Sequence, residues 1–170
     1  LTLPTKLACC ASSREFVWVD KPDYKESVRD YYVQNLAKLD VVDSFFEIKT
    51  DVLKRHCAPG DRVLAAGCGT GKIEFAIADL VGEIWGCDFT FDALQLFAER
   101  LYASDLNNIR LVNGDLTDLP FSEGGFDLLY SFSTLYYILE IDAVIRGFHE
   151  VLKEGGLAVL EFGNVLSLNA

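Results

Sequence analysis

Three glycines at alternate positions, Gly67, Gly69 and Gly71, form the stretch of this sequence best suited to holding a ligand. They follow four residues of strand character, Val63 to Ala66, and precede a predicted helix from Lys72 to Val81. Glycine tolerates positive φ angles and leaves the main chain bare, so a ligand can lie against the backbone. The start of the helix adds unpaired N–H groups that attract a carboxylate or a phosphate. The stretch predicts a ligand cradle, although an ordinary glycine-rich turn has the same local composition.

The spacing of the glycines separates the cofactor classes that use such a loop. A dinucleotide-binding Gly-x-Gly-x-x-Gly fingerprint would need a glycine at Lys72. A phosphate-binding P-loop would need a glycine at Ala66 and a hydroxyl residue at Ile73. Neither pattern fits, so an NAD-linked oxidoreductase and a P-loop nucleotide hydrolase are both disfavoured.

An acid stands at the end of the next predicted strand, Glu83 to Asp88. Asp88 lies 21 positions after Gly67, the distance at which an α/β unit brings its second strand beside the first loop. A carboxylate there can accept hydrogen bonds from both hydroxyl groups of a ribose. The alternative is an acid that caps the following helix, a role that Thr90 could equally fill.

Four blocks resemble the motifs of the class I S-adenosylmethionine-dependent methyltransferases, in the correct order between Asp61 and Phe162. The first block, Val-Leu-x-x-Gly-Cys-Gly-Thr-Gly, contains the glycine loop. The second, from Gly114 to Phe121, resembles the family's Gly-Asp-x-x-x-Leu-Pro-Phe. The third is Ser133 to Ile138, which follows the fourth predicted strand and has tyrosines where histidines are common. The fourth is Leu152 to Gly156, which resembles the family's Leu-Lys-Pro-Gly-Gly turn except that Glu154 replaces proline.

The resemblance implies a cofactor, a reaction and a set of site residues. The cofactor would be S-adenosylmethionine, with S-adenosylhomocysteine as the product, and the reaction would be methyl transfer to a small or medium-sized acceptor. Asp88 would hold the ribose, the Asp115 side chain and the Leu116 backbone would contact the adenine, and Ser131 would face the methionine part. The full implied set of cofactor-binding residues is Gly67, Cys68, Gly69, Gly71, Asp88, Phe89, Asp115, Leu116 and Ser131.

No catalytic residue follows from the sequence. Methyl transfer from an activated sulfonium does not always require a general base, and the sequence names none. Tyr136, Tyr137 and His149 are acceptor-side candidates, with a structural role favoured for His149 because it falls in a predicted helix. The acceptor atom stays open, because acceptor pockets are built from variable loops.

Two departures from the family pattern favour an alternative, a catalytically weak or inactive methyltransferase-like interaction domain. Ala65 stands where most members carry an acid that helps hold the methionine part of the cofactor. Losing one charged hydrogen-bond partner would cost about 1.5–3 kcal/mol of binding unless another group compensates. The chain also ends soon after the fifth predicted strand, whereas the family's sheet has seven. We therefore expect the usual C-terminal hairpin to be lacking and the chain to be a fragment, because it does not begin with methionine.

These residues must be positioned by the strands and helices around them. The alternation of predicted strands and helices indicates a Rossmann-like, doubly wound α/β fold. The expected sheet is mainly parallel, with strand order 3-2-1-4-5. Residues 1–60 are expected to form an N-terminal helical segment or lid, and residues 61–170 the cofactor-binding domain. Tyr24, Tyr31 and Tyr32 are candidate lid residues, although packing between helices 24–39 and 41–56 is the favoured explanation for any one of them. The remaining expected elements are strands 109–113, 126–132 and 157–162 and helices 91–104 and 141–152.

Composition limits the partners. A net charge of −11 argues against nucleic acid as a partner. The sequence contains no apolar run of about eighteen residues, so no membrane span is predicted. The five cysteines form no CxxC pair and no metal-type cluster, so we expect no metal and reduced thiols in the cytoplasm. The acceptor would be a small molecule or a protein, and the oligomeric state is undetermined.

Overall fold

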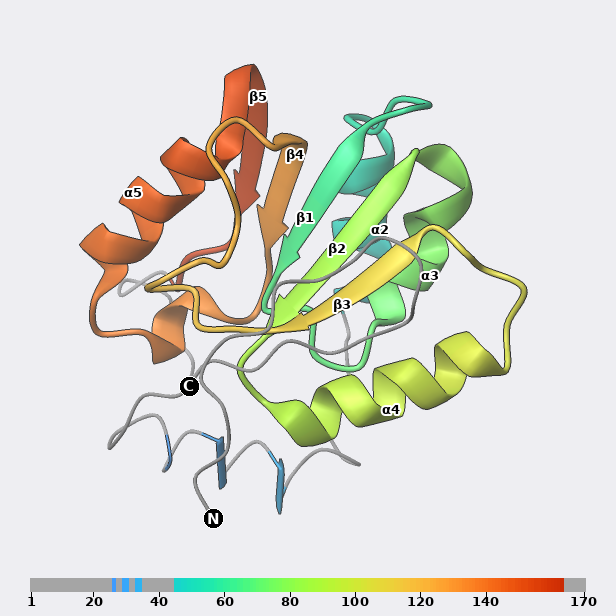
Figure 1. The fold of residues 1–170 in the computed structure, drawn as a ribbon, viewed down its shortest axis with the longest axis horizontal. Helices are drawn as coiled ribbons and strands as arrows, with labels where there is room; N and C mark the ends of the chain where they lie inside the picture. Colours follow the sequence, from blue (N-terminus) through green and yellow to red (C-terminus); the bar gives the residue numbers. More distant parts are fainter. Residues whose placement is uncertain (1–25, 27–28, 31–32, 35–44, 164–170) are drawn as a thin grey trace.

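The computed structural model describes residues 26, 29–30, 33–34 and 45–163. At its centre is a five-stranded sheet in which all neighbouring strands are parallel, in the order β3-β2-β1-β4-β5 (Figure 1). This order confirms the predicted doubly wound α/β fold. The strands are β1 Arg62–Ala66, β2 Glu83–Asp88, β3 Ile109–Asn113, β4 Phe126–Ser131 and β5 Leu152–Leu160.

Helices cover both faces of the sheet. One face packs against α2, α3 and α4, and the other packs against α5 (Figure 1). The helices are α2 Phe46–Lys54, α3 Lys72–Ile77, α4 Phe91–Tyr102 and α5 Ile141–Val151, with short 3₁₀ segments η1 Ala78–Leu80 and η2 Leu135–Tyr137. The predicted helix from Lys72 to Val81 therefore finishes as a 3₁₀ turn, a common way for a helix to end.

Successive side chains of the central strand β1 pack into two separate hydrophobic cores, one on each face of the sheet. Val63 and Ala65 join the cluster under α2, α3 and α4, whereas Leu64 and Ala66 join the cluster under α5. All four are at most 1% exposed. A strand buried on both faces must be apolar at every position, which explains why β1 reads as a continuous apolar run rather than as an alternation.

The segment from Leu152 to Gly156 is a correction to the sequence analysis, which treats it as a turn. In the structure Leu152 already pairs with Phe126, and the strand continues to Leu160. The register shifts between Phe126 and Leu128, and Gly155 takes a φ of 79°. The turn-forming glycine is absorbed as an irregularity within the strand, because a local bulge preserves pairing on both of its sides.

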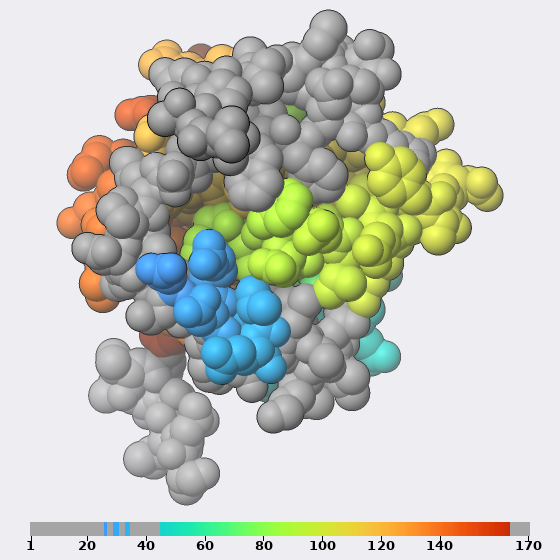
Figure 2. Space-filling view, turned by 60° about the horizontal axis from the view of Figure 1, so that its bottom comes forward, coloured from blue at the N-terminus to red at the C-terminus, as the bar shows by residue number. Residues whose placement is uncertain are grey.

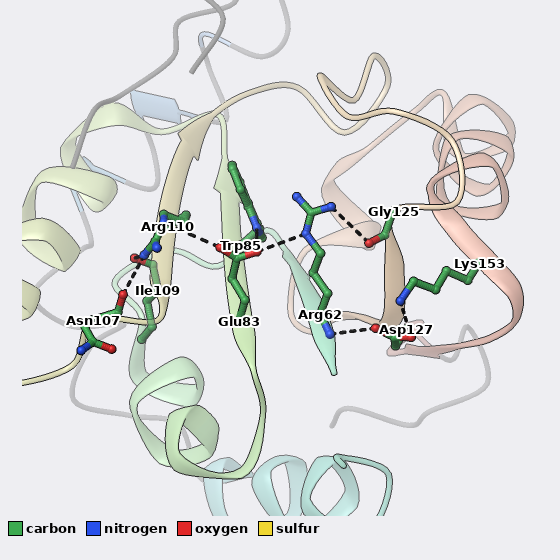
Figure 3. A network of polar contacts seen from close by, with 9 residues as sticks. All are labelled: Arg62, Glu83, Trp85, Asn107, Ile109, Arg110, Gly125, Asp127 and Lys153. Carbon is green, nitrogen blue, oxygen red and sulfur yellow. Dashed lines mark hydrogen bonds and ion pairs between the residues drawn. The ribbon is translucent and has the colours of Figure 1, made fainter. Parts of the chain in front are cut away.

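Charged side chains link the strands near their amino ends (Figure 3). Glu83 lies 3.2 Å from the Arg62 Nε and 3.7 Å from the Arg110 Nε. Asp127 accepts from the Arg62 backbone N–H at 2.9 Å and from the Lys153 ammonium at 2.7 Å. These contacts lower the pKa of Asp127, chiefly through its hydrogen bond from Lys153. The network spans all five strands at the end away from the glycine loop, so we assign it to stability.

Replacing Arg62 with alanine is expected to lower the free energy of unfolding by about 1–3 kcal/mol. The guanidinium lies 5.2 Å from the Trp85 ring centroid and 5.0 Å from that of Phe126, in addition to its ion pair with Glu83. Urea denaturation measures the change. Arg146→Ala, at an exposed position of α5, removes the same charge and should change stability by less than about 0.5 kcal/mol. Equal losses in the two variants would contradict a specific role for Arg62.

No helix in the described part of the chain is long and apolar enough to cross a membrane.

Candidate functional site

The glycine loop between β1 and α3 has a backbone conformation that favours glycine. Gly67, Gly69 and Gly71 all have positive φ angles, of 81°, 53° and 84°. A Cβ atom on Gly67 would lie 2.2 Å from the Thr134 Oγ1, inside any permitted contact. The Gly67 N–H donates to the Cys87 carbonyl at 2.7 Å, which joins the loop to the end of β2.

The carboxylate of Asp88 lies against this loop. Its Oδ2 accepts from the Gly69 N–H at 2.9 Å and its Oδ1 accepts from the Thr90 N–H at 2.8 Å. Thr90 is the N-cap residue of α4 but makes no capping hydrogen bond through its side chain. Burial raises the pKa of Asp88, and the hydrogen bonds from Thr90 and Gly69 work against this rise. The carboxylate therefore points toward the glycine loop, and Asp88 also organises the start of α4.

The second predicted block lies beside the first. The Asp88 carbonyl accepts from the Gly114 N–H at 3.0 Å and from the Asn113 Nδ2 at 2.9 Å, which joins the ends of β2 and β3. Asp115 follows directly, with its Oδ1 accepting from both the backbone N–H and the hydroxyl of Thr117 at 2.8 Å. The turn thus fixes the Asp115 carboxylate at the end of β3, the strand that pairs with β2.

The other expected site residues take different positions. Leu116 is 6% exposed and its side chain packs into the core under α5, so that only its backbone is suited to contacting a ligand. Phe89 is half-buried in the loop after β2. Ser131 is fully buried at the end of β4, and its hydroxyl has no hydrogen-bond partner among the described residues.

The cysteines near the loop act as packing residues. Cys68 is half-buried, Cys87 is fully buried, and both are free thiols. Burial raises the pKa of each thiol well above its ordinary value, so both stay protonated and unreactive at neutral pH. No group of His, Cys, Asp and Glu in the described residues has a metal-binding arrangement.

Two polar groupings at the carboxyl ends of the strands were not found from the sequence. In the first, Glu74 of α3 is 1% exposed and accepts at 2.6 Å from the Tyr130 hydroxyl of β4. In the second, the Lys49 ammonium donates to the Ser133 hydroxyl at 2.7 Å and lies 3.4 Å from Glu161. A tyrosine inside an apolar strand is the only sequence signal for the first grouping, and nothing in the sequence signals the second.

The three acceptor-side candidates lie at different ends of the sheet. Tyr136 and Tyr137 lie in η2, just after the end of β4, with ring centroids 4.4 Å apart. His149 is exposed in the last turn of α5, which leads into the amino end of β5 and so lies away from the loop. This position does not suit an acceptor-side role for His149.

The predicted lid residues Tyr24, Tyr31 and Tyr32 lie outside the described residues. The described residues of that segment are helical and lie near the arrowheads of the strands in Figure 1. Figure 2 shows the same residues in blue beside the green surface that follows β2. They are Glu26, Arg29, Asp30, Val33 and Gln34.

The grouping fits a nucleoside with a charged tail. Bare backbone lies at the end of β1, and acids that suit hydroxyl and amino donors lie at the end of β2 and directly after β3. Buried oxygens of Glu74 and Ser131 have no hydrogen-bond partner among the residues that the structure describes.

Comparison with known proteins identifies relatives of this arrangement. Residues 63–156, more than half of the chain, match the family model described as methyltransferase domain. The demethylmenaquinone methyltransferase of Geobacillus kaustophilus is 31% identical over 115 residues, which are 65% of this chain and 49% of that protein. The chain thus spans about half the length of the curated relatives it matches.

Solved structures have the same fold. The phosphoethanolamine N-methyltransferase 1 of Haemonchus contortus, in complex with phosphoethanolamine and S-adenosylhomocysteine, superposes with a TM-score of 0.68 at 19% identity. That match covers 79% of this chain and 30% of the other. The [4+2]-cyclase SpnF superposes with a TM-score of 0.63 at 27% identity, covering 65% and 42%.

Proposed function

The chain belongs to the methyltransferase-domain family, and from this membership we propose that it binds S-adenosylmethionine and transfers the methyl group to a small-molecule acceptor. The observation that carries the proposal is the Asp88 carboxylate, which lies 2.9 Å from the Gly69 N–H of the glycine loop. An acid at one strand end and bare backbone at the next suit a ribose and an amino-acid tail of the same ligand.

Different residues of the chain would contact different parts of the ligand. Asp88 would accept from the ribose hydroxyls, Asp115 from the adenine amino group, and the loop from Gly67 to Gly71 would support the tail. The bound sulfonium supplies an already activated methyl group. The protein's task is then to hold the acceptor atom about 3 Å from that methyl and in line with the sulfur.

The acceptor side would be formed after β4. Lys49, Ser133 and Glu161 lie there as a connected polar cluster, with Tyr136 and Tyr137 close by in sequence. Ser133 has a φ of 53°, unusual for a residue with a side chain, and its N–H donates to the Glu161 Oε2 at 2.8 Å. A polar, positioned cluster suits a small molecule with polar groups. The N-terminal segment would border this space as a lid, and a cytoplasmic location stays a prediction.

Titration calorimetry with S-adenosylhomocysteine tests the proposal. We expect the wild-type chain to bind in the micromolar range and Asp88→Ala to weaken binding by roughly ten- to a hundredfold, since a charged hydrogen-bond acceptor is lost. Asp92→Ala removes an exposed acid four positions later and should bind as the wild type does.

The contrary outcome is also informative. No heat from the wild-type chain at millimolar ligand would overturn the proposal and favour the interaction-domain alternative. Because Asp88 also holds the loop and the start of α4, thermal unfolding of the ligand-free variant must first show that it is folded. Methyl transfer is then measured separately, since the structural similarity to a [4+2]-cyclase shows that this fold also supports other reactions.

A further inference from the structure

Glu74 is an acid buried in the core beside the glycine loop. It is the third residue of α3 and is 1% exposed. Tyr130 donates to its Oε1, while its Oε2 is one of two buried side-chain polar atoms without a partner in the described residues. An unpaired carboxylate oxygen in a core costs free energy, and an apolar residue would pack there without that cost. The side chain therefore calls for an explanation beyond stability.

The surroundings of Glu74 are acidic or neutral. The titratable groups that act on it or respond to it are Tyr130 of β4, Cys68 of the glycine loop and Asp88 of β2. Its pKa rises from 4.5 to about 7, mainly because of burial, with the Asp88 charge adding to the rise. A cation brought to this position would meet negative charge and an open hydrogen-bond acceptor.

The position also lies next to the loop. Helix α3 begins directly after Gly71, so Glu74 stands in the first turn beyond the proposed cradle. In the sheet, Tyr130 pairs with Ala65 of β1, whose side chain on this face is only a methyl group. A carboxylate on this side of the loop comes from α3 and not from β1.

We propose that Glu74 binds the α-ammonium group of the cofactor's methionine tail, with Oε2 as the acceptor and Tyr130 holding the other oxygen in place. The proposal deepens the proposed function and rests on it. It also accounts for Ala65, because the acid expected on the strand is supplied by the neighbouring helix.

Two ligands that differ only in the tail test this role. S-adenosylhomocysteine carries the α-ammonium group, whereas 5′-methylthioadenosine has the same adenine, ribose and sulfur without the amino acid. Glu74→Gln keeps the size of the side chain and an oxygen for the Tyr130 hydrogen bond. We expect this variant to bind S-adenosylhomocysteine at least tenfold more weakly in calorimetry and to bind 5′-methylthioadenosine as the wild type does. Glu99→Gln, at an exposed position of α4, makes the same change in net charge and should alter neither affinity.

The outcomes separate the inference from the proposed function. If the wild type binds S-adenosylhomocysteine and Glu74→Gln leaves its affinity within twofold, the role of Glu74 is overturned while the function stands. An equal weakening of both ligands also overturns it, because the acid would then support the site as a whole. If the wild type binds neither ligand, the proposed function fails and takes the inference with it.

If the Glu74→Gln variant does not fold, a measurement on the wild type can still test the role of Glu74. Glu74 should be mostly protonated at about pH 6 and mostly ionised at about pH 7.5. The preference for S-adenosylhomocysteine over 5′-methylthioadenosine should therefore rise several-fold across this interval. A preference that does not change with pH would contradict an ionised Glu74 partner.

Discussion

Replacing Gly71 with alanine is expected to lower the free energy of unfolding by about 2–5 kcal/mol. Gly71 has a φ of 84°, which costs an L-residue about 1–2 kcal/mol. In addition, its Cβ would lie 2.3 Å from the ring of Phe97, a residue of α4 that is fully buried. Overpacking of this kind costs about 1–3 kcal/mol more.

A matched variant separates the two contributions. Gly155 has a φ of 79°, but a Cβ added there meets nothing within 4 Å. Gly155→Ala should therefore cost only the backbone strain of about 1–2 kcal/mol. Urea denaturation followed by circular dichroism measures both variants. Equal losses at Gly71 and Gly155 would show that the Phe97 ring yields easily and that the loop is not tightly held by α4.

Removing the charge of Glu74 is expected to stabilise the ligand-free protein at alkaline pH. The pKa of this acid is raised from 4.5 to about 7 in the folded state. Between these values the folded protein binds a proton that the unfolded chain has released, so stability falls as the pH rises. Glu74→Gln does not titrate and escapes this loss.

The size of the effect follows from linkage. The stability of Glu74→Gln relative to the wild type should increase by about 2–3 kcal/mol from about pH 5 to about pH 8. This corresponds to a relative rise of roughly 5–10 °C in the melting temperature. Asp127 also has a shifted pKa, but it is present in both proteins and cancels in the comparison. Asp88 interacts with Glu74, so the difference between the two proteins includes this interaction.

Glu99→Gln provides the control for surface charge, because its carboxylate is exposed on α4. Its stability relative to the wild type should not change with pH by more than a few tenths of a kcal/mol. A Glu74→Gln curve that runs parallel to the wild type would mean that Glu74 is ionised when folded, and an unidentified partner would then have to hold it. If Glu74→Gln is more stable than the wild type but binds the ligand more weakly, Glu74 lowers the stability of the protein and serves ligand recognition.

The sequence predicted the sheet well because each βα unit carries local signals. The strand bounds at Glu83–Asp88 and Ile109–Asn113 are reproduced, since glycine turns and apolar runs mark them on both sides. The block from Leu152 to Gly156 was the failure. A glycine pair indicates a turn before the strand, whereas in the structure this irregular stretch lies inside β5, with residues paired to β4 on both of its sides.

The sequence by itself determined the loop and the acids that follow the strands. In a parallel sheet the ends of neighbouring strands meet at one edge, so the spacing from Gly67 to Asp88 and on to Asp115 was enough to bring these residues together. Only the tertiary structure decided which polar side chains surround them. Glu74 meets Tyr130 across 56 positions and Lys49 meets Ser133 across 84, from elements with no shared motif. Such pairs are set by how a helix packs against a strand, and that packing leaves no periodic or spaced signal in the chain.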